Sequence, residues 1–135
     1  MNKLIVILII LFTFSVGGCA FDVIHVKQIP VNLESGNYCD NSFVLSTNAD
    51  ATPSGGYKRT LKQGTRWNCI GRIAQGNVYA TKDQILTIEA SNVFEAYIVI
   101  SSKKLVGFYL PVEHTYSPLD NPIPLVIDEL TQQPK

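Results

Sequence analysis

The sequence has no excess of charge of either sign and few charged residues altogether. It carries 11 Lys and Arg against 11 Asp and Glu in 135 residues, and charged residues make up only 16% of the chain. A chain without net positive charge lacks the electrostatic footprint of a nucleic-acid-binding protein, so we expect no nucleic-acid partner. The low charge together with a hydrophobic content of 46% also excludes an intrinsically disordered protein.

Groups that carry metal and nucleophilic chemistry are also scarce. The chain has two histidines, His25 and His114, and three cysteines without a CxxC spacing, which makes a zinc site or another metal site unattractive. It contains neither a Gly-x-Ser-x-Gly elbow nor a glycine-rich loop of the kind that binds phosphate. We therefore expect no cofactor and no metal, and we predict that the protein is not an enzyme.

One long hydrophobic run is present, and it lies at the N-terminus. Lys3 precedes an apolar stretch from Leu4 to Phe14, which only Thr13 interrupts. As a helix this stretch would cover about 16 Å, roughly half of a hydrocarbon core of about 30 Å, so it is too short to span a bilayer comfortably. A positive residue followed by a short apolar stretch is typical of an export signal.

The residues that end this segment, Val16-Gly17-Gly18-Cys19, resemble the signal of bacterial lipoproteins, in which an apolar residue and two small residues precede a cysteine. The resemblance covers residues 1–20 only. It implies that residues 1–18 are a cleaved signal peptide and that Cys19 carries a diacylglycerol on its thiol and an acyl group on its new amine. Such acyl chains would hold the protein at a membrane surface. An ordinary secretory signal, or a buried hairpin strand, with an unmodified Cys19 is the alternative.

The expected location of the protein in the cell follows from the same resemblance. In the Gram-negative branch of the lipoprotein class, an aspartate after the cysteine favours retention in the inner membrane, and this chain has Ala20 there. We therefore expect a protein of the cell envelope that is anchored in the outer membrane and faces the periplasm, in preference to one anchored in the inner membrane.

The two remaining cysteines, Cys39 and Cys69, form an even number in an oxidising compartment once Cys19 is assigned to lipid. We predict a disulfide bond between them, with two separately buried thiols or a metal pair as alternatives. In the chain-entropy model, closing a loop of about 30 residues stabilises the fold by roughly 3 to 4 kcal/mol.

The rest of the chain has the length of one domain. We assign residues 19–30 to the lipid anchor and a short tether, and residues 31–135 to a small β domain. Short apolar stretches separated by turn signals every eight to twelve residues or so predict an all-β fold. A small barrel and a two-layer sandwich of mainly antiparallel strands both fit, and the strand spacing from Lys58 onwards favours the barrel.

The most regular strand is expected over 66–73, where Trp67, Cys69, Gly71 and Ile73 share one parity, with Ile70 as the exception. The apolar runs 93–100 and 105–112 flank Ser101-Ser102-Lys103-Lys104 and predict a central hairpin that is covered on both faces. An extended segment is expected over 21–34, shorter strands over 42–47, 78–81, 86–90 and 125–128, and exposed loops over 48–56 and 113–124. A helix over 83–98 is an alternative that Ser91-Asn92-Val93 disfavours.

Reactive side chain types gather in one place, residues 113–120 with the sequence EHTYSPLD. The types include those of a nucleophile, a base and an orienting acid, but spacing along a loop does not create a converging geometry. We interpret the segment as a polar loop in which His114 hydrogen-bonds the backbone, with a binding role as the second reading.

Glu95 is unusual because it stands in an otherwise apolar strand. A carboxylate there must be exposed or paired, so we expect an ion pair with Arg66 or Arg72, and contact with a ligand is the second reading. Aromatic side chains that could line a pocket are more often core. They are Trp67, Tyr97, Phe108 and Tyr109. The candidate binding residues are Glu95, Trp67, Tyr109 and His114.

Two kinds of non-catalytic function fit these expectations. The first is a lipid-anchored binding or assembly module that docks on another envelope protein or on the cell wall, where tethering makes a weak contact effectively intramolecular. The second is a ligand-binding or enzyme-inhibitor lipoprotein that uses an exposed loop or an aromatic pocket. An exposed apolar patch on the 93–112 hairpin would favour docking, whereas a concave aromatic pocket with Glu95 at its mouth would favour a ligand site.

Overall fold

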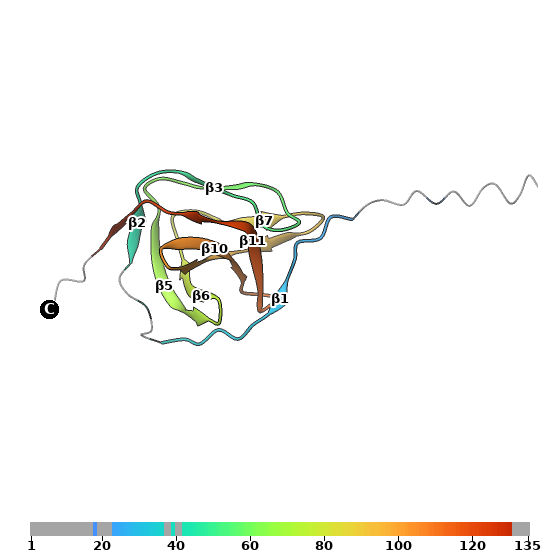
Figure 1. Ribbon diagram of the computed structural model, residues 1–135, viewed down its shortest axis with the longest axis horizontal. Coiled ribbons are helices and arrows are strands. Elements are labelled where there is room, and N and C mark those ends of the chain that lie inside the picture. Colours follow the sequence, from blue (N-terminus) through green and yellow to red (C-terminus); the bar gives the residue numbers. More distant parts are fainter. Residues whose placement is uncertain (1–17, 19–22, 37–38, 40–41, 131–135) are drawn as a thin grey trace, which may run out of the picture.

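The structure is a computed structural model that describes Gly18, residues 23–36, Cys39 and residues 42–130 (Figure 1). This part of the chain consists of strands, turns and extended segments without a helix, so none of it forms a helix that could span a membrane. The helix considered for 83–98 is absent, and the region forms strands. The predictions for the signal peptide, for Cys19 and for Ala20 lie outside the described residues.

The described residues form twelve strands. They are β1 (Ile29–Pro30), β2 (Phe43–Leu45), β3 (Ala49–Ala51), β4 (Arg59–Leu61), β5 (Arg66–Ile73), β6 (Gly76–Ala80), β7 (Thr87–Glu89), β8 (Val93–Glu95), β9 (Tyr97–Ser101), β10 (Lys104–Leu110), β11 (Thr115–Pro124) and β12 (Ile127–Glu129).

Eight of these strands make one antiparallel sheet in the order β1-β11-β10-β9-β6-β5-β2-β12, while β3 pairs with β4 and β7 pairs with β8 in two small sheets. The large sheet is open and has β1 and β12 at its edges, and the small sheets lie against one of its faces (Figure 1). The all-β prediction is confirmed. Of the two architectures left open, the fold is sandwich-like and is not the closed barrel that the strand spacing favoured.

Hydrophobic side chains pack on both faces of the large sheet. On the face that the small sheets cover, they form the main core. Its buried members are Val26, Phe43, Leu45, Ala51, Leu61, Trp67, Tyr79, Leu86, Ile88, Ala96, Ile98, Leu105, Phe108, Leu110 and Leu119. The opposite face carries a second cluster of Ile73, Val78, Val99, Tyr109 and Tyr116. Strands β9 and β10 contribute to both, which confirms that the hairpin they form is central and covered on both faces.

A bulge in β5 changes which face its side chains meet. Cys69 is paired with Tyr79 and Gly71 with Val78, so Ile70 is an extra residue in β5. Trp67 and Cys69 before the bulge therefore belong to the main core, and Ile73 after it belongs to the second cluster. The parity predicted to face inward is buried, at Trp67, Gly71 and Ile73, or half-buried, at Cys69. These side chains do not all lie on one face of the sheet, because alternation holds only while the ladder is regular.

The segment 29–34, which we call the strap, covers the second cluster. Its first residues pair with β11, Val31 and Leu33 pack against the cluster, and Glu34 exchanges backbone hydrogen bonds of 2.9 and 3.0 Å with Arg72 of β5. The chain approaches β5 so closely here that a Cβ on Gly71 would clash with the Glu34 carbonyl oxygen. The extended segment was expected, and its passage across the sheet is seen along the lower edge of Figure 1.

The apolar run 93–100 is divided between two sheets. β8 pairs with β7 and β9 pairs with β6 and β10, and the chain passes from one sheet to the other at Ala96, which is 3% exposed. The hairpin turn is tighter than the four residues expected, since Ser101 and Lys104 are paired and only Ser102 and Lys103 form the loop. Both have positive φ, 50° and 62°, as the turn of a two-residue hairpin requires.

The two segments expected as exposed loops are partly strands. Residues 49–51 form β3, and Ala51 is 1% exposed; residues 115–124 form β11 along β10. Pro118 has no backbone N–H group to donate to a neighbouring strand. It fits here because its carbonyl accepts a hydrogen bond of 2.8 Å from the Ser54 amide. The pairing of β11 with β10 is irregular between Pro118 and Ile123, where the strand bulges.

The predicted disulfide bond between Cys39 and Cys69 is present, with the two Cα atoms 5.9 Å apart. It joins the chain just after the strap to the bulged part of β5. The folded part also starts earlier than position 31, because Val26 lies in the main core and Ile29–Pro30 are in the sheet.

Replacing both cysteines, Cys39→Ser with Cys69→Ser, should lower the free energy of unfolding by about 3 to 4 kcal/mol, because a crosslink that spans 30 residues restricts the unfolded chain. Urea unfolding of the variant and of the oxidised protein measures the difference. Equal midpoints for the two proteins would contradict the expectation, as would two reactive thiols in the denatured, unreduced protein.

Candidate functional site

The aromatic residues proposed to line a pocket do not come together. Trp67 and Phe108 are both 0% exposed in the main core, whereas Tyr97 and Tyr109 pack on the opposite face of the sheet. Two of the candidate binding residues, Trp67 and Tyr109, therefore have buried side chains that stabilise the fold. The aromatic pocket of the sequence-based hypothesis is not formed.

Glu95 is an exposed residue at the end of β8. The ion pair expected for it is not formed: Arg72 pairs with Glu34, with Nε and Oε2 3.0 Å apart, and Glu95 instead interacts with the Tyr97 hydroxyl. Since Glu95 is in contact with solvent, its charge needs no partner in the protein.

His114 lies in the turn between β10 and β11 with a φ of 54°. Its Nδ1 is 3.3 Å from the Tyr109 hydroxyl, and its carbonyl accepts a hydrogen bond of 3.1 Å from the Val31 amide of the strap. The hydrogen bond expected between the His114 ring and the backbone is not seen: the ring contacts the Tyr109 hydroxyl, and only the His114 main chain bonds the strap. No carboxylate is hydrogen-bonded to the His114 ring among the described residues, so these residues do not bring a catalytic set together here.

Three tyrosines form a row across the second face. Tyr97, Tyr109 and Tyr116 are in register on β9, β10 and β11, and the Tyr97 and Tyr109 rings are 6.4 Å apart. Burial raises the pKa of all three above the ordinary value of 10.0. The Glu95 carboxylate raises the pKa of Tyr97 further, because a second negative charge beside it is unfavourable.

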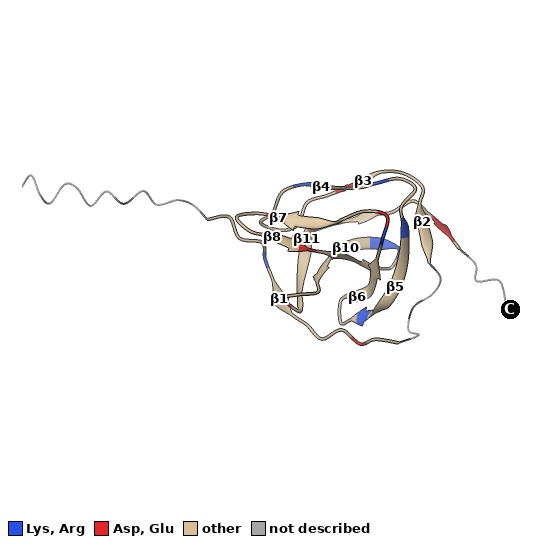
Figure 2. Cartoon of the chain, turned by 180° about the vertical axis from the view of Figure 1, so that it is seen from behind, with Lys and Arg blue, Asp and Glu red and all other residues tan. Residues whose placement is uncertain are grey.

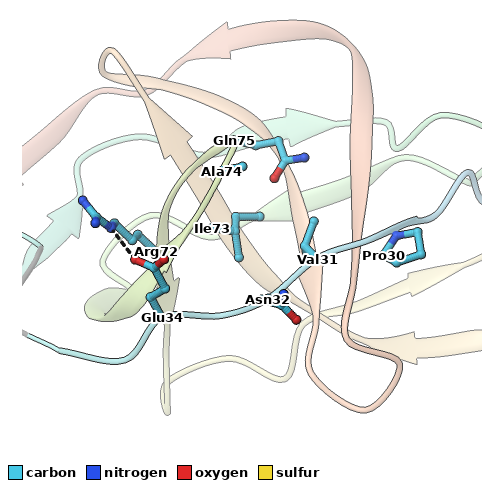
Figure 3. Close-up of a pocket in the computed structure, with 8 residues that line it drawn as sticks. All are labelled: Pro30, Val31, Asn32, Glu34, Arg72, Ile73, Ala74 and Gln75. Carbon is cyan, nitrogen blue, oxygen red and sulfur yellow. Dashed lines mark hydrogen bonds and ion pairs between the residues drawn. The ribbon is translucent and has the colours of Figure 1, made fainter.

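One surface hollow lies beside the strap (Figure 3). Its volume is about 580 Å³, and its walls come from the strap and from residues 72–75. In Figure 3 the Glu34 and Arg72 side chains meet at one end, and Val31 and Ile73 lie between the two segments. Because the Glu34 and Arg72 side chains pair with each other, we interpret this hollow as the space between the strap and residues 72–75 and not as a ligand site.

A second hollow, of about 310 Å³, lies beside Tyr97, and we call it the Tyr97 hollow. Leu86, Ala96 and Tyr97 supply its apolar lining, and Lys82 and Glu95 supply opposite charges. Its volume is at the lower end of the range for ligand sites. Here a candidate residue from the sequence, Glu95, lines a concave surface.

Between this hollow and a third one lies the most exposed large hydrophobic side chain of the described residues. Ile85 is 88% exposed, and it lines both the Tyr97 hollow and a hollow of about 520 Å³ on the other side. Sequence reasoning missed it. The signal was available, because the inward alternation of Leu86 and Ile88 leaves Ile85 on the outward parity.

Hydrogen bonds fasten the loop 81–85, which we call the Ile85 loop, to the neighbouring strands. The Gln84 amide group accepts from the Lys62 amide at 3.1 Å and donates to the Thr60 carbonyl at 3.0 Å. The Asp83 carboxylate accepts from the Arg66 amide at 2.8 Å. The two side chains just before Ile85 therefore hold the loop in place, while Ile85 itself is exposed to solvent.

Basic side chains surround the Ile85 loop. Lys58, Arg59 and Lys62 line the third hollow, and Lys82 lines the Tyr97 hollow. Two of these cations have partners, since Lys58 lies 3.8 Å from Asp50 and Arg59 lies 3.4 Å from Glu89. The surface around Ile85 thus combines one apolar side chain with a charged rim of these four basic side chains and the carboxylates of Asp83 and Glu95.

The described residues contain no group of three or more His, Cys, Asp or Glu that could hold a metal ion. Comparison of the chain with protein-family models, with curated proteins and with solved structures gives no match.

The tyrosine row predicts how stability changes in alkali. Raised pKa values mean that the folded protein keeps these protons when the unfolded chain, near pH 10, has lost them. The free energy of unfolding should therefore be unaffected by these groups below about pH 9 and should fall above pH 10. Urea unfolding between pH 8 and 11 or so measures this.

Tyr97→Phe should reduce the loss of stability in alkali, since it removes one of the three ionisable groups. Tyr57→Phe, which removes the same atom from a tyrosine that is 53% exposed, is the matched control. An alkaline slope that Tyr97→Phe leaves unchanged would contradict the assignment.

Proposed function

We propose that the protein is a lipid-anchored component of the bacterial cell envelope whose β domain is a non-catalytic binding or assembly module. The observation that carries this proposal is Ile85, an exposed apolar side chain on a loop that side-chain hydrogen bonds hold in place. The Val16-Gly17-Gly18-Cys19 sequence supports the anchor, and Ala20 supports the outer membrane facing the periplasm.

The fixed geometry of the Ile85 loop favours recognition of another macromolecule. A single apolar anchor that enters a pocket of a partner contributes much of the binding energy of many interfaces. Because Asp83 and Gln84 already hold the loop, binding does not have to order it, and less of the interaction energy is lost to entropy. The two hollows beside Ile85 would receive partner side chains from either side.

The rim indicates the chemistry of the partner. Lys62 and Lys82 are exposed on opposite sides of Ile85, and neither takes part in an ion pair within the described residues. A partner surface with acidic groups around an apolar pocket is complementary to this arrangement. We infer that the partner is an envelope protein with such a surface. An anionic cell-wall component is the alternative partner.

Because of the lipid anchor, a modest affinity for the partner is sufficient for binding. A domain that is tethered to the same membrane as its partner experiences a high effective concentration, so a weak contact is occupied most of the time. This mechanism needs no cofactor and no reaction, and the proposed activity is binding alone.

A ligand-binding role is the second candidate, and the Tyr97 hollow favours it. This hollow combines an apolar lining with Glu95 and Lys82, so it suits a small molecule that carries charges of both signs. An inhibitory role for the segments 48–56 and 113–120 has less support, since β3 occupies part of the first and β11 most of the second.

A photocrosslinking amino acid at position 85 of the full-length protein, in the native envelope, should form a crosslink to one partner. Val112, which is 71% exposed on another turn, is the matched control position and should give none. Lys62→Glu with Lys82→Glu should abolish the crosslink, because it reverses the charge of the rim. A small-molecule function would leave position 85 without a specific crosslink.

Once the partner is identified, Ile85→Asp should weaken binding by about 2 kcal/mol or more, which is at least about 30-fold in Kd. Isothermal titration with the isolated partner measures the change, and Val112→Asp should bind like the original protein. Equal affinities of the two variants would contradict the proposed docking site.

Metabolic labelling with a fatty-acid probe tests the anchor. The original protein should incorporate the label and Cys19→Ser should not, because only the Cys19 thiol starts the acylation sequence that the signal implies. Cys39→Ser with Cys69→Ser is the control for thiol chemistry and should remain labelled. Label that persists in Cys19→Ser would refute the lipoprotein assignment.

A further inference from the structure

Exposed hydrophobic side chains gather at the end of the domain where the N-terminal segment leaves it. Val23, Ile24, Tyr57 and Val93 are 53, 41, 53 and 65% exposed, and we call them the tether-side patch. They come from three separate parts of the sequence. In Figures 1 and 2 the tip of β7–β8 and the departing N-terminal chain lie at the same end of the domain, and the C-terminus lies at the other end.

Hydrogen bonds bring these segments together. The Ile24 amide donates to Ser91 Oγ at 2.9 Å, and the Ser91 amide donates to the Ile24 carbonyl at 3.0 Å, so the N-terminal segment is fixed to the tip of β7–β8. The Tyr57 amide donates to the Glu89 carbonyl at 2.9 Å, which fixes the 54–57 turn to the same hairpin.

The N-terminal segment also lies close to the 54–57 turn. Gly55 has a φ of 77°, and a Cβ there would clash with the His25 carbonyl oxygen. The Lys27 amide donates to the Ser54 carbonyl at 2.9 Å. The N-terminal segment therefore leaves the domain between the 54–57 turn and the β7–β8 tip, with exposed apolar side chains around its exit.

The length of chain before this exit sets the distance to the anchor. Cys19 is four residues before Val23. Four residues of fully extended chain span at most about 14 Å, so the acylated residue is never farther than that from Val23 of the patch. An acyl chain at Cys19 would therefore hold this end of the domain close to the surface of the bilayer.

We propose that the tether-side patch rests on the membrane, with its side chains at the boundary between headgroups and acyl chains. The proposal rests on the acylation of Cys19 proposed above. The side chains suit this place, since valine and isoleucine are apolar and tyrosine prefers the interface, where its ring is buried and its hydroxyl is hydrated. The membrane here is a second contact of the domain, in addition to the lipid.

This contact fixes the orientation of the docking site. Ile85 and the tip residue Ser91 lie at opposite ends of β7, six residues apart along the chain, which corresponds to roughly 20 Å in extended structure. With the β7–β8 tip against the membrane, the Ile85 loop is held away from the bilayer, where a partner can reach it.

An environment-sensitive fluorescent amino acid at position 93 of the mature, acylated protein tests the contact. On vesicles of phosphatidylethanolamine and phosphatidylglycerol, its emission should shift to the blue and be quenched by lipids that carry a spin label near the headgroup. The same probe at position 126, where Val126 is 57% exposed near the C-terminal end, should show neither change. Tyr57→Ser should shrink the blue shift at position 93, and a substitution at the other end, Val126→Ser, should leave it unchanged.

The failures of the two proposals are distinguishable in this experiment. Protein that sediments with the vesicles but shows no blue shift at position 93 overturns the membrane contact and leaves the anchor intact. Protein that does not sediment with the vesicles overturns the anchor, and the membrane contact with it. Equal shifts at positions 93 and 126 would also overturn the proposal, because they would mean that no one end of the domain faces the bilayer.

Discussion

Both faces of the large sheet are apolar, and the need to cover both is the constraint on which the rest of the structure depends. The small sheets β3–β4 and β7–β8 cover one face, and the strap covers the other. A single extended segment buries little surface of its own, so it has to be held at both ends. Pairing with β11 holds one end, and pairing with β5 next to the Cys39–Cys69 disulfide holds the other. Folding and oxidation of the domain are therefore coupled through this one segment.

The course of the strap also determines where the N-terminal chain leaves the domain. Residues before the strap run between the 54–57 turn and the tip of β7–β8, and the exposed apolar side chains of the tether-side patch surround that exit. Strand β7 connects this end to the Ile85 loop. One short strand thus links the proposed membrane contact to the proposed docking site, and its length separates the two surfaces.

The sequence predicted those features that depend on local pattern. The limits of β5, the β9–β10 hairpin, the all-β class and the disulfide all follow from alternation, β-branched residues and the count of cysteines. Features that depend on distant partners were missed. Prolines lie in or near residues 49–51 and 115–124, and both segments were predicted as loops. In the structure they form strands because they pair with β4 and β10. The bulge at Ile70 moved the later side chains of β5 to the other face of the sheet. Ile70 was the one exception to the alternating pattern, but an apolar residue on the polar parity does not by itself distinguish a bulge from a strand that is covered on both faces.

The candidate site shows the same division between residue type and position. Trp67 and Tyr109 were chosen because aromatic residues are common in binding sites. In a domain of this size, large apolar side chains are needed to fill the core, and both of these are buried. Ile85 has no distinguishing chemistry, and only its outward position makes it notable. Its exposure would be of little interest on a loop without fixed structure, since single exposed apolar residues are common. Here the hydrogen bonds of Asp83 and Gln84 fix the loop in the free protein, so the entropy of ordering it is lost on folding and not on binding. An apolar side chain held in this way is ready to enter a partner, and that readiness, more than the identity of the residue, supports a binding function.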